Sequence, residues 1–180
     1  MIIQTSHANS PDWKDLQVHS ILHEQLLPLE EIVHNLWWTW NEEARILFQK
    51  LDPVFWDSGD KNPVELLQSL TNERCEEIIN DKALMSDLQA VYDKFSKYMS
   101  EKPNSDRPSV AYFSMEYGMS HVLKIYSGGL GVLAGDYMKE ASDSNVDMTA
   151  VGFLYRYGYF TQWLALDGQQ EAKYEAQNFG

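Results

Sequence analysis

The sequence has 180 residues, of which 44% are hydrophobic and 13% aromatic, enough for a folded core and unlike a disordered chain. Its 14 Lys and Arg against 27 Asp and Glu give a formal net charge of −13, which repels phosphate backbones and anionic lipid headgroups. We therefore expect neither nucleic acid nor a membrane as partner, whereas a neutral polymer is not excluded.

Cysteine usage and the start of the chain bear on the compartment. Cys75 is the only cysteine, so no intramolecular disulfide can form, and we interpret it as a helix residue rather than a catalytic thiol. The first ten residues lack the basic and apolar regions of a secretory leader, and no segment approaches the ~20 apolar residues of a membrane span. We expect a cytoplasmic protein.

The first half of the chain is predicted to be helical. From Leu29 to Leu51 apolar residues recur at steps of three and four, the pattern of one buried helix face, and Asp52-Pro53 ends this helix. Asn62-Pro63 is an N-cap followed by proline at the first helical position, and it opens a short helix.

A further helix is expected around Glu76, and Leu84 to Met99 has the apolar spacing of a helix of about 17 residues. The polar run Ser100 to Pro108 is the predicted linker. We therefore divide the chain into a helical region over 1–105 and a second region over 106–180.

The second region has the pattern of an α/β sheet. Val110 to Met115 is predicted to be a buried strand, and Met148 to Tyr155 a second one. Between them a helix starts at Gly128-Gly129, with Leu130, Leu133, Ala134, Tyr137, Met138 and Ala141 on one face. This order predicts the beginning of a parallel sheet, and Tyr157 to Leu166 with the turn Asp167-Gly168 predicts a hairpin.

The glycine-rich stretch from Tyr126 to Gly131 allows two interpretations. Glycines just before a helix let the backbone approach a ligand, and the unpaired N–H groups of the first turn can bind an anion. A tight strand-to-helix turn explains the same spacing, and both remain open. Gly131-Val132-Leu133 differs from the Gly-Lys-Ser/Thr of a Walker loop, and the dinucleotide fingerprint matches only loosely. Basic residues are scattered, so we expect an anion site to use backbone N–H groups or cations from outside this chain.

Several other side chains have a structural and a functional interpretation. Trp37 and Trp40 are expected on the buried face of the first helix, which leaves Trp38 as the candidate for stacking on a sugar. His19 and His23 have the spacing of zinc ligands, but no third ligand is near, and we expect no metal.

Three ordered blocks resemble the α-glucan phosphorylases. They are Tyr112-Phe-Ser-Met-Glu-Tyr-Gly118, Ile125-Tyr-Ser-Gly-Gly-Leu-Gly-Val-Leu-Ala-Gly-Asp136 and Gly152-Phe-Leu-Tyr-Arg-Tyr-Gly-Tyr-Phe160. His34-Asn-Leu-Trp-Trp-Thr-Trp-Asn41 resembles the N-terminal helical region of the shorter bacterial and archaeal members. Ser127 and Val132 stand where longer members carry Asn and Arg, which fits the shorter type.

The resemblance implies the two-domain GT-B fold, of which this chain would hold the helical region and the start of the N-terminal Rossmann-like domain. It implies phosphorolysis of α-1,4-glucan by inorganic phosphate with retention of configuration, and pyridoxal 5′-phosphate on a lysine of the C-terminal domain. By resemblance, Gly128, Gly129, Leu130 and Gly131 bind substrate and phosphate through their backbone N–H groups, and Glu116 is a positioning carboxylate near them.

The sequence given ends at Gly180 without a cofactor lysine motif or a second domain, so we expect this piece alone to be inactive. A homodimer is left open. Two alternatives remain: a glycogen or starch synthase-like glycosyltransferase, and a non-catalytic remnant that binds glucan or protein. A synthase usually places Lys-Thr before the glycines, where this chain has Tyr126-Ser127.

Overall fold

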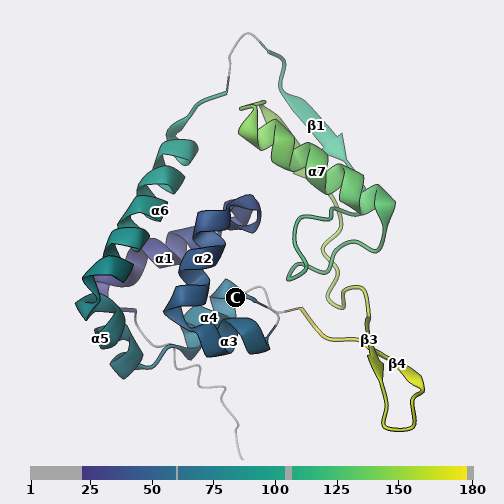
Figure 1. Ribbon diagram of the computed structural model, residues 1–180. Coiled ribbons are helices and arrows are strands. Elements are labelled where there is room, and N and C mark those ends of the chain that lie inside the picture. The colour runs from purple at the N-terminus through teal and green to yellow at the C-terminus, as the bar shows by residue number, and fades with distance from the viewer. Residues whose placement is uncertain (1–21, 60, 104–106, 178–180) are drawn as a thin grey trace, which may run out of the picture.

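The computed structural model describes residues 22–59, 61–103 and 107–177. The helices and strands have the following bounds: η1 (Glu24–Leu26), α1 (Leu27–Val33), η2 (Leu36–Trp40), α2 (Glu42–Leu51), α3 (Pro53–Ser58), α4 (Pro63–Ser69), α5 (Asn72–Asn80), α6 (Lys82–Ser100), β1 (Val110–Phe113), α7 (Gly129–Asp143), β2 (Met148–Val151), β3 (Thr161–Leu164) and β4 (Gln170–Lys173). The helices up to α6 form a helical region, and the elements from β1 onward form an α/β region (Figure 1). The mixture of helices and small sheets agrees with the predicted α/β class.

Side-chain caps explain why the helices of the first region begin where they do. Asn62 accepts a hydrogen bond from the N–H of Val64 at the start of α4, as its pairing with proline predicts. Asp81 accepts from Ala83 and Leu84 at 2.9 and 3.0 Å at the start of α6. The predicted helix around Glu76 is α5, and the predicted helix ending near Met99 is α6.

The single helix predicted from Leu29 to Leu51 is wrong, because two asparagines interrupt it. The side chain of Asn35 accepts from the N–H of Trp37 at 2.9 Å and begins the 3₁₀ helix η2. The side chain of Asn41 donates to the carbonyl of Trp37 at 2.8 Å, just before α2. Asparagine offers such local hydrogen bonds in place of the helical ladder, and apolar spacing does not reveal this.

The three tryptophans of η2 are placed differently from the prediction. Trp37 is buried as expected, but Trp38 is also buried, with its ring 5.8 Å from Phe48 and 6.4 Å from Trp56. Trp40 is only half-buried. A 3₁₀ helix has three residues per turn rather than 3.6, which turns different side chains inward. Trp38 is therefore a core residue and offers no face to a sugar.

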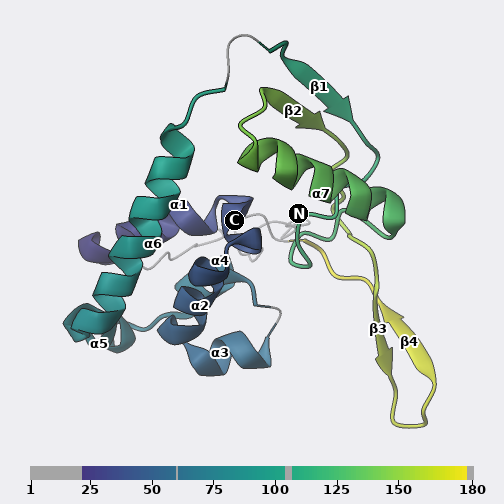
Figure 2. The same cartoon turned by 45° about the horizontal axis from the view of Figure 1, so that its top comes forward.

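The α/β region contains the predicted strand–helix–strand unit, but β1 ends at Phe113 rather than Met115 and β2 at Val151 rather than Tyr155. Strands β1 and β2 are parallel, with Val110 opposite Met148 and Phe113 opposite Val151, and Figure 2 shows them beside α7. The expectation of a buried first strand is wrong, since Phe113 is 72% exposed. A strand is buried on both faces only when layers cover both. Among the residues described, this sheet has two strands, and α7 lies beside it.

The predicted hairpin is confirmed over a shifted range. Strands β3 and β4 pair antiparallel, with Thr161 opposite Lys173 and Leu164 opposite Gln170. Their turn contains Gly168 at φ 81°, a left-handed conformation that glycine adopts without strain. The hairpin extends away from the rest of the molecule (Figures 1 and 2), and the residues of both strands are exposed.

Candidate functional site

The three sequence blocks come together at the start of α7. A pocket of about 390 Å³ opens there, and each block contributes to its wall. Its lining residues are Met115, Glu116, Lys124, Ile125, Tyr126, Ser127, Leu130, Tyr155, Tyr157, Gly158 and Tyr159. The pocket thus combines tyrosine rings with a carboxylate, an ammonium group and the first residues of a helix.

The glycine stretch forms the N-terminal end of α7. Gly128 is the N-cap in an extended conformation, and the first helical hydrogen bond runs from the N–H of Val132 to the carbonyl of Gly128, at 3.1 Å. The N–H groups of Gly128, Gly129, Leu130 and Gly131 donate to no acceptor among the residues described. Gly128 to Leu130 are exposed, so their N–H groups are available to a ligand, as an anion site requires, whereas Gly131 is buried.

Glu116 lies directly beside this stretch, and its carboxylate is held in place. Oε2 of Glu116 accepts from the backbone N–H of Ser127 at 2.6 Å and from its hydroxyl at 3.2 Å. The hydroxyl of Ser114 donates to the carbonyl of Glu116 at 2.8 Å. The carboxylate is therefore oriented before any ligand arrives, and it joins the end of the first block to the start of the second.

Two glycines let the segment after β1 pack closely on the first turns of α7. The N–H of Gly118 donates to the carbonyl of Gly131 at 2.7 Å. A Cβ atom at Gly131 would lie 2.5 Å from Cβ of Tyr126, and one at Gly135 would lie 2.3 Å from the carbonyl oxygen of Gly118. Neither position can take a larger residue without a shift of its neighbours.

Gly128 and Gly129 are different, because the fold does not require glycine at either position. An added Cβ atom would meet no atom within 4 Å at either one, and neither residue has a positive φ. Open space around two glycines beside a pocket is the arrangement that lets a ligand approach the backbone closely.

The third block closes the pocket through tyrosines and Lys124. The hydroxyl of Tyr155 donates to the carbonyl of Met115 at 3.4 Å, and the N–H of Tyr159 donates to the carbonyl of Lys124 at 3.3 Å. A Cβ atom at Gly158 would lie 2.3 Å from Cβ of Lys124. Contact with Lys124 therefore requires glycine at position 158.

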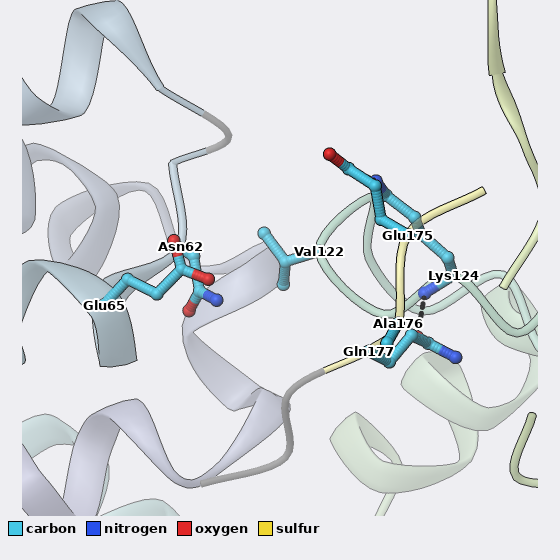
Figure 3. A pocket seen from close by; sticks show the side chains of 7 residues that line it. All are labelled: Asn62, Glu65, Val122, Lys124, Glu175, Ala176 and Gln177. Carbon is cyan, nitrogen blue, oxygen red and sulfur yellow. Dashed lines mark hydrogen bonds and ion pairs between the residues drawn. The ribbon is translucent and has the colours of Figure 1, made fainter. Parts of the chain in front are cut away.

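Lys124 is a feature that the sequence analysis missed. Its Nζ lies 3.3 Å from Glu175 and 3.4 Å from the hydroxyl of Thr161, and its backbone N–H donates to Gln177 at 2.8 Å. Lys124, Glu175 and Gln177 line a smaller cavity of about 90 Å³ that reaches Asn62 and Glu65 of the helical region (Figure 3). The sequence led us to expect an anion site built from backbone N–H groups or from cations outside this chain, and Lys124 adds a cation of this chain to the lining of the larger pocket. Its position just before the second block was the available signal.

Nearby ionisable groups have shifted pKa values with simple causes. Burial raises the pKa of Tyr117, whose hydroxyl lies 2.6 Å from the carbonyl oxygen of Tyr112. Lys173 and Lys124 lower the pKa of Glu175 through hydrogen bonds. The carboxylate of Glu175 is thus kept ionised and remains paired with Lys124 at neutral pH.

The remaining candidates do not gather into a site. Within the described part of the chain, no three His, Cys, Asp or Glu side chains could share a metal ion, and His19 lies outside that part. Burial raises the pKa of the Cys75 thiol, which lowers its reactivity at neutral pH. None of the helices described is both long and apolar enough to span a membrane.

Comparison with known proteins gives matches over most of the chain. Residues 22–123 match the family described as protein of unknown function, DUF3417. The chain is 42% identical over 162 residues to the maltodextrin phosphorylase of Thermococcus litoralis, which covers 86% of this chain and 19% of that protein. It is 40% identical over 153 residues to the glycogen phosphorylase of Aquifex aeolicus, covering 83% of this chain and 22% of that protein.

The glycogen phosphorylase of Mycobacterium tuberculosis is 37% identical over 169 residues, which covers 87% of this chain and 20% of that protein. The chain spans about one fifth of the length of these curated relatives. No solved structure matches it. The chain therefore belongs to the DUF3417 family, and its resemblance to the α-glucan phosphorylases is confirmed over more than four fifths of its length.

Proposed function

We propose that this chain is the N-terminal part of a retaining α-glucan phosphorylase, which cleaves α-1,4-glucan with inorganic phosphate and releases glucose 1-phosphate. The names of the matched relatives support this class of reaction. The meeting of the three sequence blocks around one pocket supports the location of the site. In this proposal residues 1–105 are the helical region and 106–180 begin the Rossmann-like domain of a GT-B fold, in a cytoplasmic enzyme.

One observation carries the assignment: the N–H groups of Gly128 to Gly131 are unpaired beside the pocket, and the fold does not require glycine at 128 and 129. Ser127 and Leu130, which flank the two glycines, both line the pocket. Backbone donors at a helix start suit a phosphate or a sugar oxygen that gains negative charge. Because they are already in place, they need no rearrangement when that charge develops.

Glu116 and Lys124 have supporting roles in this proposal. The carboxylate of Glu116 accepts two hydrogen bonds from Ser127, so we assign it to positioning the glycine stretch rather than to proton transfer. The ammonium group of Lys124 is engaged by Glu175 and adds positive charge to the wall of the pocket. The tyrosines of the third block are proposed to line the path of the glucan.

The proposed cofactor, pyridoxal 5′-phosphate, would supply a phosphate group that relays a proton during phosphorolysis. A Schiff base to this cofactor needs a lysine with a free amine. Lys124, the lysine that lines the pocket among the residues described, is paired with Glu175 and does not fit that role. We therefore propose that another part of the full-length protein holds the cofactor, and that this chain contributes binding and orientation.

The experiment is an assay of the full-length protein with maltodextrin and inorganic phosphate, following release of glucose 1-phosphate with and without pyridoxal phosphate. We expect release that depends on both phosphate and the cofactor. Release that persists after the cofactor is removed would reject the proposal. So would glucan extension that requires a nucleotide sugar, which is the activity of the synthase alternative.

A further inference from the structure

Helix α7 connects the glycine stretch to the helical region. It contains 15 residues, so its two ends lie about 22 Å apart. Its N-terminal end forms part of the pocket, and its C-terminal end contacts residues of α6 and η2. A change at the C-terminal end can therefore reach the pocket through a rigid element.

The contact at the C-terminal end of α7 is a cluster of hydrogen bonds on Asp143. The hydroxyl of Tyr98 donates to Oδ1 of Asp143 at 2.8 Å and lies 2.6 Å from the hydroxyl of Ser142. The indole N–H of Trp40 donates to the same Oδ1 atom at 3.1 Å. Two donors from the helical region thus converge on one carboxylate oxygen of α7.

A carboxylate at this place is unfavourable without such donors. The C-terminal end of a helix carries partial negative charge, and the last turn of α7 has no basic residue. Asp143 is tolerated at this position because neutral donors from η2 and α6 form hydrogen bonds with its carboxylate. Packing also holds the side chain of Tyr98 in place, because its ring lies 6.1 Å from that of Trp37, which is buried in the helical core.

A second contact holds the segment that leads into the glycine stretch. Val122 packs against the hydrophobic core of the helical region. In Figure 3 its side chain lies between Asn62 of that region and Lys124. The helical region therefore holds both the segment before the glycine stretch and the far end of the helix that follows it.

We propose that Trp40 and Tyr98 are positioning residues: through Asp143 they fix α7 along its axis and so set the geometry of the glycine stretch against Glu116 and Gly118. This assigns a role to the helical region, which the DUF3417 match covers. The relevance of that geometry to catalysis rests on the proposed function, but the geometry itself can be measured without any activity.

The test is hydrogen–deuterium exchange of the full-length protein, read in peptides that contain the N–H groups of Gly118 and Ser127. Both groups are hydrogen-bonded to the start of α7 or to Glu116. The Tyr98→Phe variant removes the hydroxyl, and we expect these peptides to exchange about two to five times faster. The matched control is Tyr92→Phe, because Tyr92 lies on the same helix and donates to Glu31 inside the helical region. It should leave both peptides unchanged.

Two further variants separate positioning from general loss of stability. Asp143→Asn keeps an oxygen acceptor and should exchange like the wild type, whereas Asp143→Ala should behave like Tyr98→Phe. The proposal is overturned if Tyr98→Phe leaves the Gly118 and Ser127 peptides unchanged, or if it accelerates them no more than the peptides of α2. Since no assay of phosphorolysis is involved, this failure is distinct from failure of the proposed function.

Discussion

At the residue scale, the glycines before and within α7 have different requirements. Gly131 is fixed by its neighbours, because an added Cβ atom would lie 2.5 Å from Tyr126 and 3.1 Å from Cγ of Glu116. Gly129 has open space around it and an ordinary backbone conformation. Packing within the fold explains why residue 131 is glycine. A ligand that approaches the backbone closely would explain why residue 129 is glycine.

This contrast predicts opposite effects for two alanine variants. Gly131→Ala should lower the free energy of unfolding by about 1–3 kcal/mol, because neighbouring groups must move. Gly129→Ala should leave it unchanged or raise it by up to about 1 kcal/mol, since alanine favours helix. In the full-length protein, the proposed function predicts that Gly129→Ala still weakens phosphate binding. Chemical denaturation and phosphate titration measure the two quantities, and unaltered phosphate binding in Gly129→Ala would contradict the assignment.

Tyr98 gives a prediction for alkaline pH. Burial, with a further contribution from Asp143, raises the pKa of Tyr98 from 10.0 to about 12. The folded chain therefore retains a proton that the unfolded chain loses, and the stabilisation is complete below pH 10 and lost as pH rises through about 12.

The measurement is the difference in free energy of unfolding between the wild type and Tyr98→Phe at several pH values. The wild type should lose stability relative to the variant from about pH 10 upward. A difference that stays constant across this range would contradict the raised pKa.

At the element scale, the residues at which a helix or turn begins were easier to predict from local sequence than whether a helix continues without a break. Asn62-Pro63 predicts the start of α4, and Asp167-Gly168 predicts the hairpin turn, because each pair has a strong conformational preference of its own. The break between α1 and α2 depends on Asn35 and Asn41 bonding to nearby backbone, while the apolar spacing continues through it. Periodicity reports which residues face a core and does not reveal such a break.

The cap of α6 can be tested with a matched pair of variants. Asp81→Ala removes the acceptor of two backbone N–H groups and should lower the free energy of unfolding by about 1 kcal/mol. Asp93→Ala removes the same charge from the exposed side of α6, where Gln89 is the one donor to the carboxylate among the residues described. This variant should cost less than about 0.5 kcal/mol. Equal losses in the two variants would show that charge rather than capping matters.

The candidate site was only partly predictable from sequence. The resemblance to phosphorylases pointed to Glu116 and the glycine stretch, and the structure places them in contact through Ser127. The roles assigned to these residues stay predictions. Lys124 was missed because the contacts that place it, to Gln177 and Glu175, join segments about 50 residues apart that no local pattern relates.

At the scale of the whole molecule, the helical region buries its apolar side chains more completely than the α/β region does. The main hydrophobic core lies in the helical region. In the α/β region Phe113, Phe153 and Leu154 are more than 60% exposed. Apolar surface of this kind is commonly buried by another part of the same protein or by a partner. This distribution fits a chain that spans about one fifth of its curated relatives.

The central claim is that the N–H groups of Gly128 to Gly131 bind phosphate. It is tested most directly by NMR of the full-length protein labelled with ¹⁵N-glycine and titrated with inorganic phosphate in the presence of maltodextrin. The account predicts that the resonances of Gly128, Gly129 and Gly131 shift with phosphate, whereas that of Gly168 in the distant hairpin turn does not. Resonances of the three glycines that remain unchanged at saturating phosphate would contradict it.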